Sequence, residues 1–268
     1  MQNPNNDQDD DHDGITFEVV EEETGADGEK VRNAGIYLLP NLFTTAALFS
    51  GFYAIIASMQ GRFEPAAIAI FFAALFDGMD GRVARMTNTQ SAFGEQYDSL
   101  SDLVSFGVAP AILVFSWSLQ TLGKFGWICA FIYMVCAAFR LARFNVQIGS
   151  VDKRYFIGLA SPLAAAIIAS MVWAGFDNQM PNHMKEFAIV ASAITVFTGF
   201  LMVSNFKFYS FKELDRSRVP FAMMLPVVLV MGIVFYDLPI GLLAVSVVYA
   251  MSAPVTAIWH KMRPAKSL

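Results

Sequence analysis

Four aspartates, Asp77, Asp80, Asp98 and Asp102, stand within 26 residues of a chain that is otherwise strongly apolar. Asp77 and Asp80 are three residues apart, and Asp98 and Asp102 are four apart, so each pair shares one face of a helix. An antiparallel hairpin of these two helices would bring the pairs together. Two like charges about 4 Å apart repel by roughly 4 kcal/mol at an effective dielectric near 20. Something must therefore hold the carboxylates together.

Divalent cations are the groups best suited to that role, because the neighbouring Arg82 and Arg85 cannot offset four negative charges. Hard cations such as Mg²⁺ and Mn²⁺ bind a few carboxylates together with substrate phosphates. Two such ions can act on both sides of a phosphoryl transfer. We expect two divalent ions, Mg²⁺ or Mn²⁺, at this hairpin. The alternative is a set of solvated charges at helix ends, but acids at membrane depth usually mark function.

The composition is that of a multi-span membrane protein, with 56% hydrophobic and only 15% charged residues. A spanning helix needs roughly 20 apolar residues. The sequence predicts an all-α polytopic bundle of about eight transmembrane helices, at 36–59, 64–84, 99–119, 125–144, 156–176, 187–205, 219–236 and 238–259.

Charge divides the chain into three regions. Residues 1–34 hold 11 of the 23 acidic residues, and we expect a disordered acidic cytoplasmic tail there. Residues 35–260 are the predicted transmembrane catalytic domain, and 261–268 a basic cytoplasmic tail. With eight crossings, 15 of the 18 Lys and Arg residues fall on one side, which predicts that both termini and the hairpin face the cytoplasm. We expect a location in the cell (inner) membrane, with the bilayer as a partner and no nucleic acid.

The hairpin carries the pattern D-x-x-D-G-x-x-A-R-x8-G-x3-D-x3-D, formed by Asp77, Asp80, Gly81, Ala84, Arg85, Gly94, Asp98 and Asp102. This pattern resembles the signature of the CDP-alcohol phosphotransferase family. The resemblance implies a transferase in which an alcohol attacks the β-phosphate of a CDP-linked donor and CMP is released. It implies Asp77, Asp80 and Asp98 as the principal metal ligands, and Asp102 as general base with a further metal contact. It also implies a nucleotide and diphosphate site at Asp77, Gly81, Ala84, Arg85 and Gly94.

Four flanking stretches, 98–111, 139–145, 155–166 and 201–212, are similar to those of the family's membrane-integral phosphatidylserine synthases. This resemblance implies CDP-diacylglycerol as donor, L-serine as acceptor and a homodimer. Glycerol 3-phosphate, inositol phosphate and choline are the alternative acceptors, although the absence of Arg from 40–51 is evidence against glycerol phosphate. A divalent-cation transporter is a more remote alternative, because transporters usually bind ions near the middle of the membrane.

An acceptor such as serine also needs a cation for its carboxylate. Arg140 and Arg143 lie at the predicted cytoplasmic end of the fourth helix. The guanidinium group can donate two parallel hydrogen bonds to a carboxylate. The sequence favours either residue for this role and leaves open that both simply anchor the helix on the cytoplasmic side.

Overall fold

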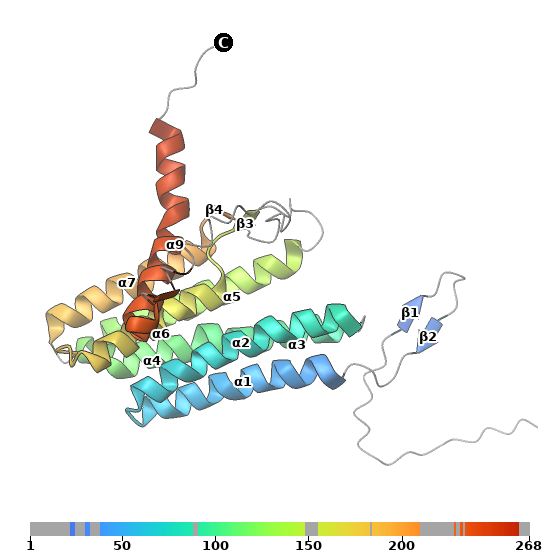
Figure 1. The fold of residues 1–268 in the computed structure, drawn as a ribbon, viewed down its shortest axis with the longest axis horizontal. Helices are drawn as coiled ribbons and strands as arrows, with labels where there is room; N and C mark the ends of the chain where they lie inside the picture. The colour runs from blue at the N-terminus through green and yellow to red at the C-terminus, as the bar shows by residue number, and fades with distance from the viewer. Residues whose placement is uncertain are drawn as a thin grey trace, which may run out of the picture.

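A computed structural model of the chain shows a bundle of long helices, which α9 crosses at a steep angle and extends beyond (Figure 1). The structure describes residues 22–24, 30–32, 38–87, 91–147, 155–182, 184–209, 228, 231–232 and 234–262. The helices are α1 (Leu38–Met59), α2 (Phe63–Thr87), α3 (Ala92–Asp102), η1 (Leu103–Val108), α4 (Ala109–Trp117), η2 (Leu119–Leu122), α5 (Lys124–Gln147), α6 (Ser161–Asp177), α7 (Lys185–Val203) and α9 (Leu238–Met262). The predicted all-α class is confirmed.

Two short antiparallel pairs of strands accompany the helices. In one pair β1 (Glu22–Thr24) lies beside β2 (Lys30–Arg32), and in the other β3 (Tyr155–Ile157) lies beside β4 (Lys207–Tyr209). The first pair falls within the predicted acidic tail, of which the structure describes these six residues. Disorder of the tail as a whole stays a prediction.

Five described segments are long and apolar enough to cross a membrane, namely Pro40–Met59, Phe93–Trp117, Lys124–Val146, Lys185–Val203 and Leu238–Thr256. Helix α6 is apolar but shorter, and α2 carries its two aspartates within its 25 residues. The chain is therefore a multi-pass membrane protein. The count of eight spans stays a prediction, because most of the predicted span 219–236 lies outside the described residues.

The buried core of the bundle is rich in alanine. Ala54, Ala57, Ala66, Ala67 and Ala73 are each no more than 1% exposed. Small side chains let membrane helices approach closely, and van der Waals packing rather than water exclusion then holds the helices together. This close packing brings α1 against both helices that carry the aspartates.

The segment that carries Asp98 and Asp102 changes its winding immediately after Asp102. Leu103–Val108 is a π-helix, and the Ala109 N–H donates to the Val104 carbonyl five residues earlier. A single π turn within an α-helix is rare and is found frequently at functional sites. Here it separates the acidic α3 from the apolar α4.

Neighbours on two sides hold this π turn in place. The Ser105 hydroxyl donates to the Ala47 carbonyl of α1 at 3.1 Å. The buried Tyr133 hydroxyl of α5 donates to the Phe106 carbonyl, also at 3.1 Å. Gly51 of α1 faces Ser105 so closely that a Cβ there would lie 2.5 Å from the Ser105 Oγ. The absence of a side chain at Gly51 thus permits the contact between α1 and the π turn.

The segment before α6 is held by the pairing of β3 with β4. Gly158, at φ 81°, follows β3, and a Cβ there would lie 2.3 Å from the Met202 carbonyl oxygen. Ser161 begins α6, with Pro162 in its first turn. The predicted span that begins at residue 156 is therefore wrong at its start, because strand pairing and the left-handed glycine delay the helix by five residues.

Candidate functional site

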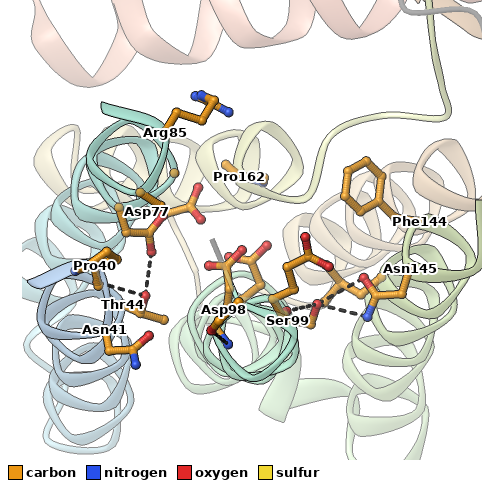
Figure 2. Close-up of a pocket in the computed structure, with 18 of the residues that line it drawn as sticks. Pro40, Asn41, Thr44, Asp77, Arg85, Asp98, Ser99, Phe144, Asn145 and Pro162 are labelled. Carbon is orange, nitrogen blue, oxygen red and sulfur yellow. Dashed lines mark hydrogen bonds between the residues drawn. The ribbon is translucent and has the colours of Figure 1, made fainter. Parts of the chain in front are cut away.

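A pocket of about 550 Å³ opens between the first turns of α1, the C-terminal part of α2, α3, the C-terminal part of α5 and the start of α6. Figure 2 shows the side chains that line it. Every predicted site residue except Arg143 belongs to this lining. The hairpin predicted from the spacing of the aspartates is formed by α2 and α3, which place both acidic pairs at this pocket.

Three of the four aspartates converge most closely. Asp77, Asp98 and Asp102 each present a carboxylate oxygen, and these three oxygens lie within 4.8 Å of one another. Figure 2 shows Asp77 of α2 and Asp98 of α3 directed into the same space. Asp80 is arranged differently. Its Oδ2 accepts a hydrogen bond from the Thr44 hydroxyl at 2.8 Å, and its side chain is only 6% exposed.

This cluster fits a divalent metal ion. Carboxylate oxygens are the ligands that hard cations prefer. Mg²⁺ binds oxygen at 2.0–2.1 Å, so two oxygens on one ion are at most about 4.2 Å apart. A spread of up to 4.8 Å among the oxygens of Asp77, Asp98 and Asp102 needs only a small side-chain movement to close on an ion.

The start of α3 is fixed by a capping residue beside the pocket. Ser91 precedes the helix in an extended conformation, and its hydroxyl accepts a hydrogen bond from the Gly94 N–H at 2.9 Å. Serine is a favoured residue at this position because it satisfies an N–H group that the helix leaves free. A Cβ on Gly94 would lie 3.1 Å from the Ser91 Oγ, and the Asn41 side chain is also near. The absence of a side chain at Gly94 thus leaves room for the Ser91 cap.

Residues predicted to accommodate the nucleotide lie along the α2 wall. A Cβ on Gly81 would meet no atom within 4 Å, so this glycine leaves open space facing the pocket. Ala84 lies one turn further along the same helix. The exposed Arg85 extends along the edge of the pocket, away from the carboxylates, in Figure 2.

The structure separates the two candidate arginines of α5. Arg140 lines the pocket, and its guanidinium donates to the Ser161 hydroxyl at the start of α6. Arg143 instead donates to the Val203 carbonyl and, at 2.7 Å, to the Asn205 side chain. Arg143 therefore ties α5 to the end of α7, whereas Arg140 lies beside the aspartates.

Several residues that line the pocket were not predicted from the sequence as site residues. Thr44 contacts Asp80, and the Ser99 hydroxyl and Asn145 side chain lie 3.0 to 3.1 Å apart across α3 and α5. Ser99 immediately follows Asp98, which is a signal that could have been used. Asn145 ends the stretch 139–145 that resembles the phosphatidylserine synthases, although it was not predicted individually. Thr44 gave no comparable signal, because it lies far along the chain from the aspartates.

Known proteins resemble this chain over most of its helical part. Residues 37–201 match the family described as CDP-alcohol phosphatidyltransferase. A CDP-diacylglycerol–serine O-phosphatidyltransferase of Helicobacter pylori is 34% identical over 190 residues, covering 71% of this chain and 79% of that protein. The archaetidylserine synthase of Methanothermobacter thermautotrophicus is 35% identical over 175 residues, covering 63% and 69%. The yeast (Saccharomyces cerevisiae) CDP-diacylglycerol–serine O-phosphatidyltransferase is 40% identical over 139 residues, covering 47% and 50%.

Among solved structures, the phosphatidylinositol phosphate synthase of Mycobacterium tuberculosis with CDP-DAG bound is similar with a TM-score of 0.46 and 19% identity. The similarity covers 62% of this chain and 80% of that one. The family match covers more than half of the chain and includes the complete aspartate signature. The chain therefore belongs to the CDP-alcohol phosphatidyltransferase family.

Proposed function

We propose that this chain is an enzyme that transfers the phosphatidyl group of CDP-diacylglycerol to the hydroxyl of L-serine, giving phosphatidylserine and CMP. The observation that carries the proposal is the convergence of the signature aspartates of α2 and α3 on one pocket. Family membership supports the transfer chemistry. The names of the Helicobacter and yeast relatives support serine as the acceptor.

In this proposal Asp102 takes the proton of the serine hydroxyl while the hydroxyl oxygen attacks the β-phosphorus, which carries the diacylglycerol. The bond from that phosphorus to the bridging oxygen breaks, and CMP leaves with the electron pair. Asp77, Asp80, Asp98 and Asp102 hold two divalent ions, Mg²⁺ or Mn²⁺. When bound, the ions supply positive charge that offsets the diphosphate and the departing CMP. Asp102 is suited to proton transfer because it lines the same pocket as the metal ligands.

We assign the α2 wall to the donor. Gly81 and Ala84 leave room for the nucleotide, and Arg85 reaches the diphosphate from the edge of the pocket. Gly94 acts indirectly in this proposal, because its missing side chain leaves room for the Ser91 cap in the lining of the pocket.

We assign the acceptor carboxylate to Arg140 rather than Arg143. Arg140 reaches the pocket between the aspartates and the start of α6, where Ser161 accepts one of its hydrogen bonds. A guanidinium has five N–H donors, so Arg140 can donate to a carboxylate as well as to Ser161, and a planar guanidinium binds a carboxylate through two parallel bonds. Serine bound there would have its hydroxyl within the pocket that holds Asp102.

The test of the proposed function is CMP release by the full chain, purified in detergent, with CDP-diacylglycerol and Mg²⁺ or Mn²⁺. Serine is compared with glycerol 3-phosphate, inositol phosphate, choline and no acceptor, and the lipid product is identified by mass. We expect serine-dependent release with phosphatidylserine as product. Release driven by another acceptor would keep the family chemistry and refute serine, whereas metal flux into sealed vesicles without CMP release would favour a transporter.

Arg140→Lys is expected to raise the KM for serine by about 10- to 100-fold. Lysine keeps the charge but loses the second parallel hydrogen bond to the serine carboxylate. A hydrogen bond to a charged group contributes about 1.5–3 kcal/mol, which corresponds to this change in KM. The KM for CDP-diacylglycerol should change little. The measurement is initial CMP release at varied serine and then at varied donor. Arg143→Lys is compared in the same way, and a larger serine effect there would transfer the acceptor site to Arg143.

The arrangement of the protein in the cell is also a proposal. We place both termini and the pocket on the cytoplasmic face of the cell (inner) membrane, because 15 of the 18 basic residues fall on that side of an eight-span chain. A homodimer is proposed by resemblance to the family.

A further inference from the structure

Thr44 of α1 holds the most buried of the four aspartates. Its hydroxyl lies 2.8 Å from the Asp80 Oδ2 and 3.3 Å from the Pro40 carbonyl, so the carboxylate is the nearer acceptor. Thr44 is 3% exposed and Asp80 is 6% exposed. A hydrogen bond to a buried carboxylate is stronger than one between neutral groups, and removing its donor leaves a desolvated charge.

The backbone of the same residue holds the other acidic helix. The Ser101 hydroxyl donates to the Thr44 carbonyl at 3.1 Å, and Ser101 directly precedes Asp102. Ser101 is itself 2% exposed, so this contact is also shielded from water. One residue of α1 thus contacts Asp80 of α2 through its side chain and α3 through its carbonyl group.

We propose that Thr44 is a positioning residue that sets the direction of the Asp80 carboxylate for metal binding. The Thr44 hydroxyl fixes Oδ2 of Asp80, and Asp80 lines the same pocket as the cluster formed by Asp77, Asp98 and Asp102. Groups that orient metal ligands in this way typically change metal affinity 10- to 100-fold when removed. The inference rests on the proposed function, in which the aspartates hold divalent ions.

The experiment measures Mn²⁺ binding to the full chain in detergent, without substrate, from the electron paramagnetic resonance signal of free Mn²⁺. Thr44→Val removes the hydroxyl and keeps the shape, and Thr44→Ser keeps the hydroxyl. Thr45→Val is the matched control, because the Thr45 hydroxyl is exposed and contacts the Asn41 carbonyl and Tyr97. We expect about 10- to 100-fold weaker Mn²⁺ binding in Thr44→Val, with near wild-type affinity in Thr44→Ser and Thr45→Val.

Equal Mn²⁺ affinity of wild type and Thr44→Val would overturn the proposal. Thermal unfolding of each variant shows whether it folds. Should Thr44→Val fail to fold, Thr44→Cys replaces it, because a thiol is a weak donor, and equal affinity of Thr44→Cys and Thr44→Ser would then overturn the proposal. If the wild-type chain binds no Mn²⁺, the metal site of the proposed function fails, and the role of Thr44 fails with it.

Discussion

Asp102→Asn is expected to reduce CMP release by about 10²- to 10⁴-fold, the range that a positioned general base contributes. The amide keeps the shape of the carboxyl group but cannot take the proton of the attacking hydroxyl. Its oxygen is also a poorer ligand for a hard cation than a carboxylate is. The measurement is the initial rate of CMP release at saturating serine, donor and Mn²⁺. At saturation the rate reports kcat, so weaker binding of serine, donor or Mn²⁺ does not lower it.

Asp177→Asn is the matched control for Asp102→Asn, because it makes the same chemical change at an exposed position at the end of α6. We expect it to release CMP at the wild-type rate. Retention of activity within about fivefold in Asp102→Asn, well below the contribution of a general base, would remove Asp102 from the role of base. Mn²⁺ binding by Asp102→Asn then separates the two assigned roles, since loss of a base alone leaves the ions bound.

Removal of divalent metal is expected to abolish CMP release, with a loss of about 10³-fold or more. Each ion is expected to stabilise the developing charge by several kcal/mol, and every 1.36 kcal/mol corresponds to a tenfold change in rate. Without the ions the carboxylates of Asp77, Asp98 and Asp102 face one another and the donor's diphosphate unscreened. The measurement is CMP release in excess EDTA, followed by addition of Mg²⁺ or Mn²⁺.

Restoration of activity by Mg²⁺ or Mn²⁺, and not by Na⁺ at the same ionic strength, is the expected outcome after chelation. The sodium control separates specific binding from general screening, which salt also provides. Undiminished release in excess EDTA would refute a metal-dependent mechanism and, with it, the assignment of the aspartates as ligands.

The convergence of the aspartates could be predicted from the sequence because it depends on local spacing. Residues three or four apart share a helix face, and only three residues of sequence separate Thr87, the end of α2, from Ser91, so the acidic ends of the two helices cannot lie far apart. The same spacing could not distinguish Asp77 from Asp80. That difference depends on Thr44, which lies 36 residues from Asp80, and a threonine in an apolar helix has no local feature that reveals such a partner.

The two arginines of α5 show a similar limit of sequence reasoning. Arg140 and Arg143 are three residues apart, and positive charge near a membrane surface suits both. Their different surroundings depend on where α6 begins and α7 ends. These ends depend on the pairing of β3 with β4 and on Gly158, which hydropathy alone did not reveal.

The π turn at Leu103–Val108 rotates the helix faces of α3 and α4 relative to each other, although the two helices belong to one membrane span. An α-helix advances about 100° per residue, and a π turn contains one residue more than an α turn. The face of α3 that bears Asp98 and Asp102 is therefore offset by about that angle from the face a uniform helix would continue into α4. The π turn therefore lets α4 pack in the bundle with one face while the carboxylates of α3 point in a different direction. The number of residues in the turn determines the angle between the two faces.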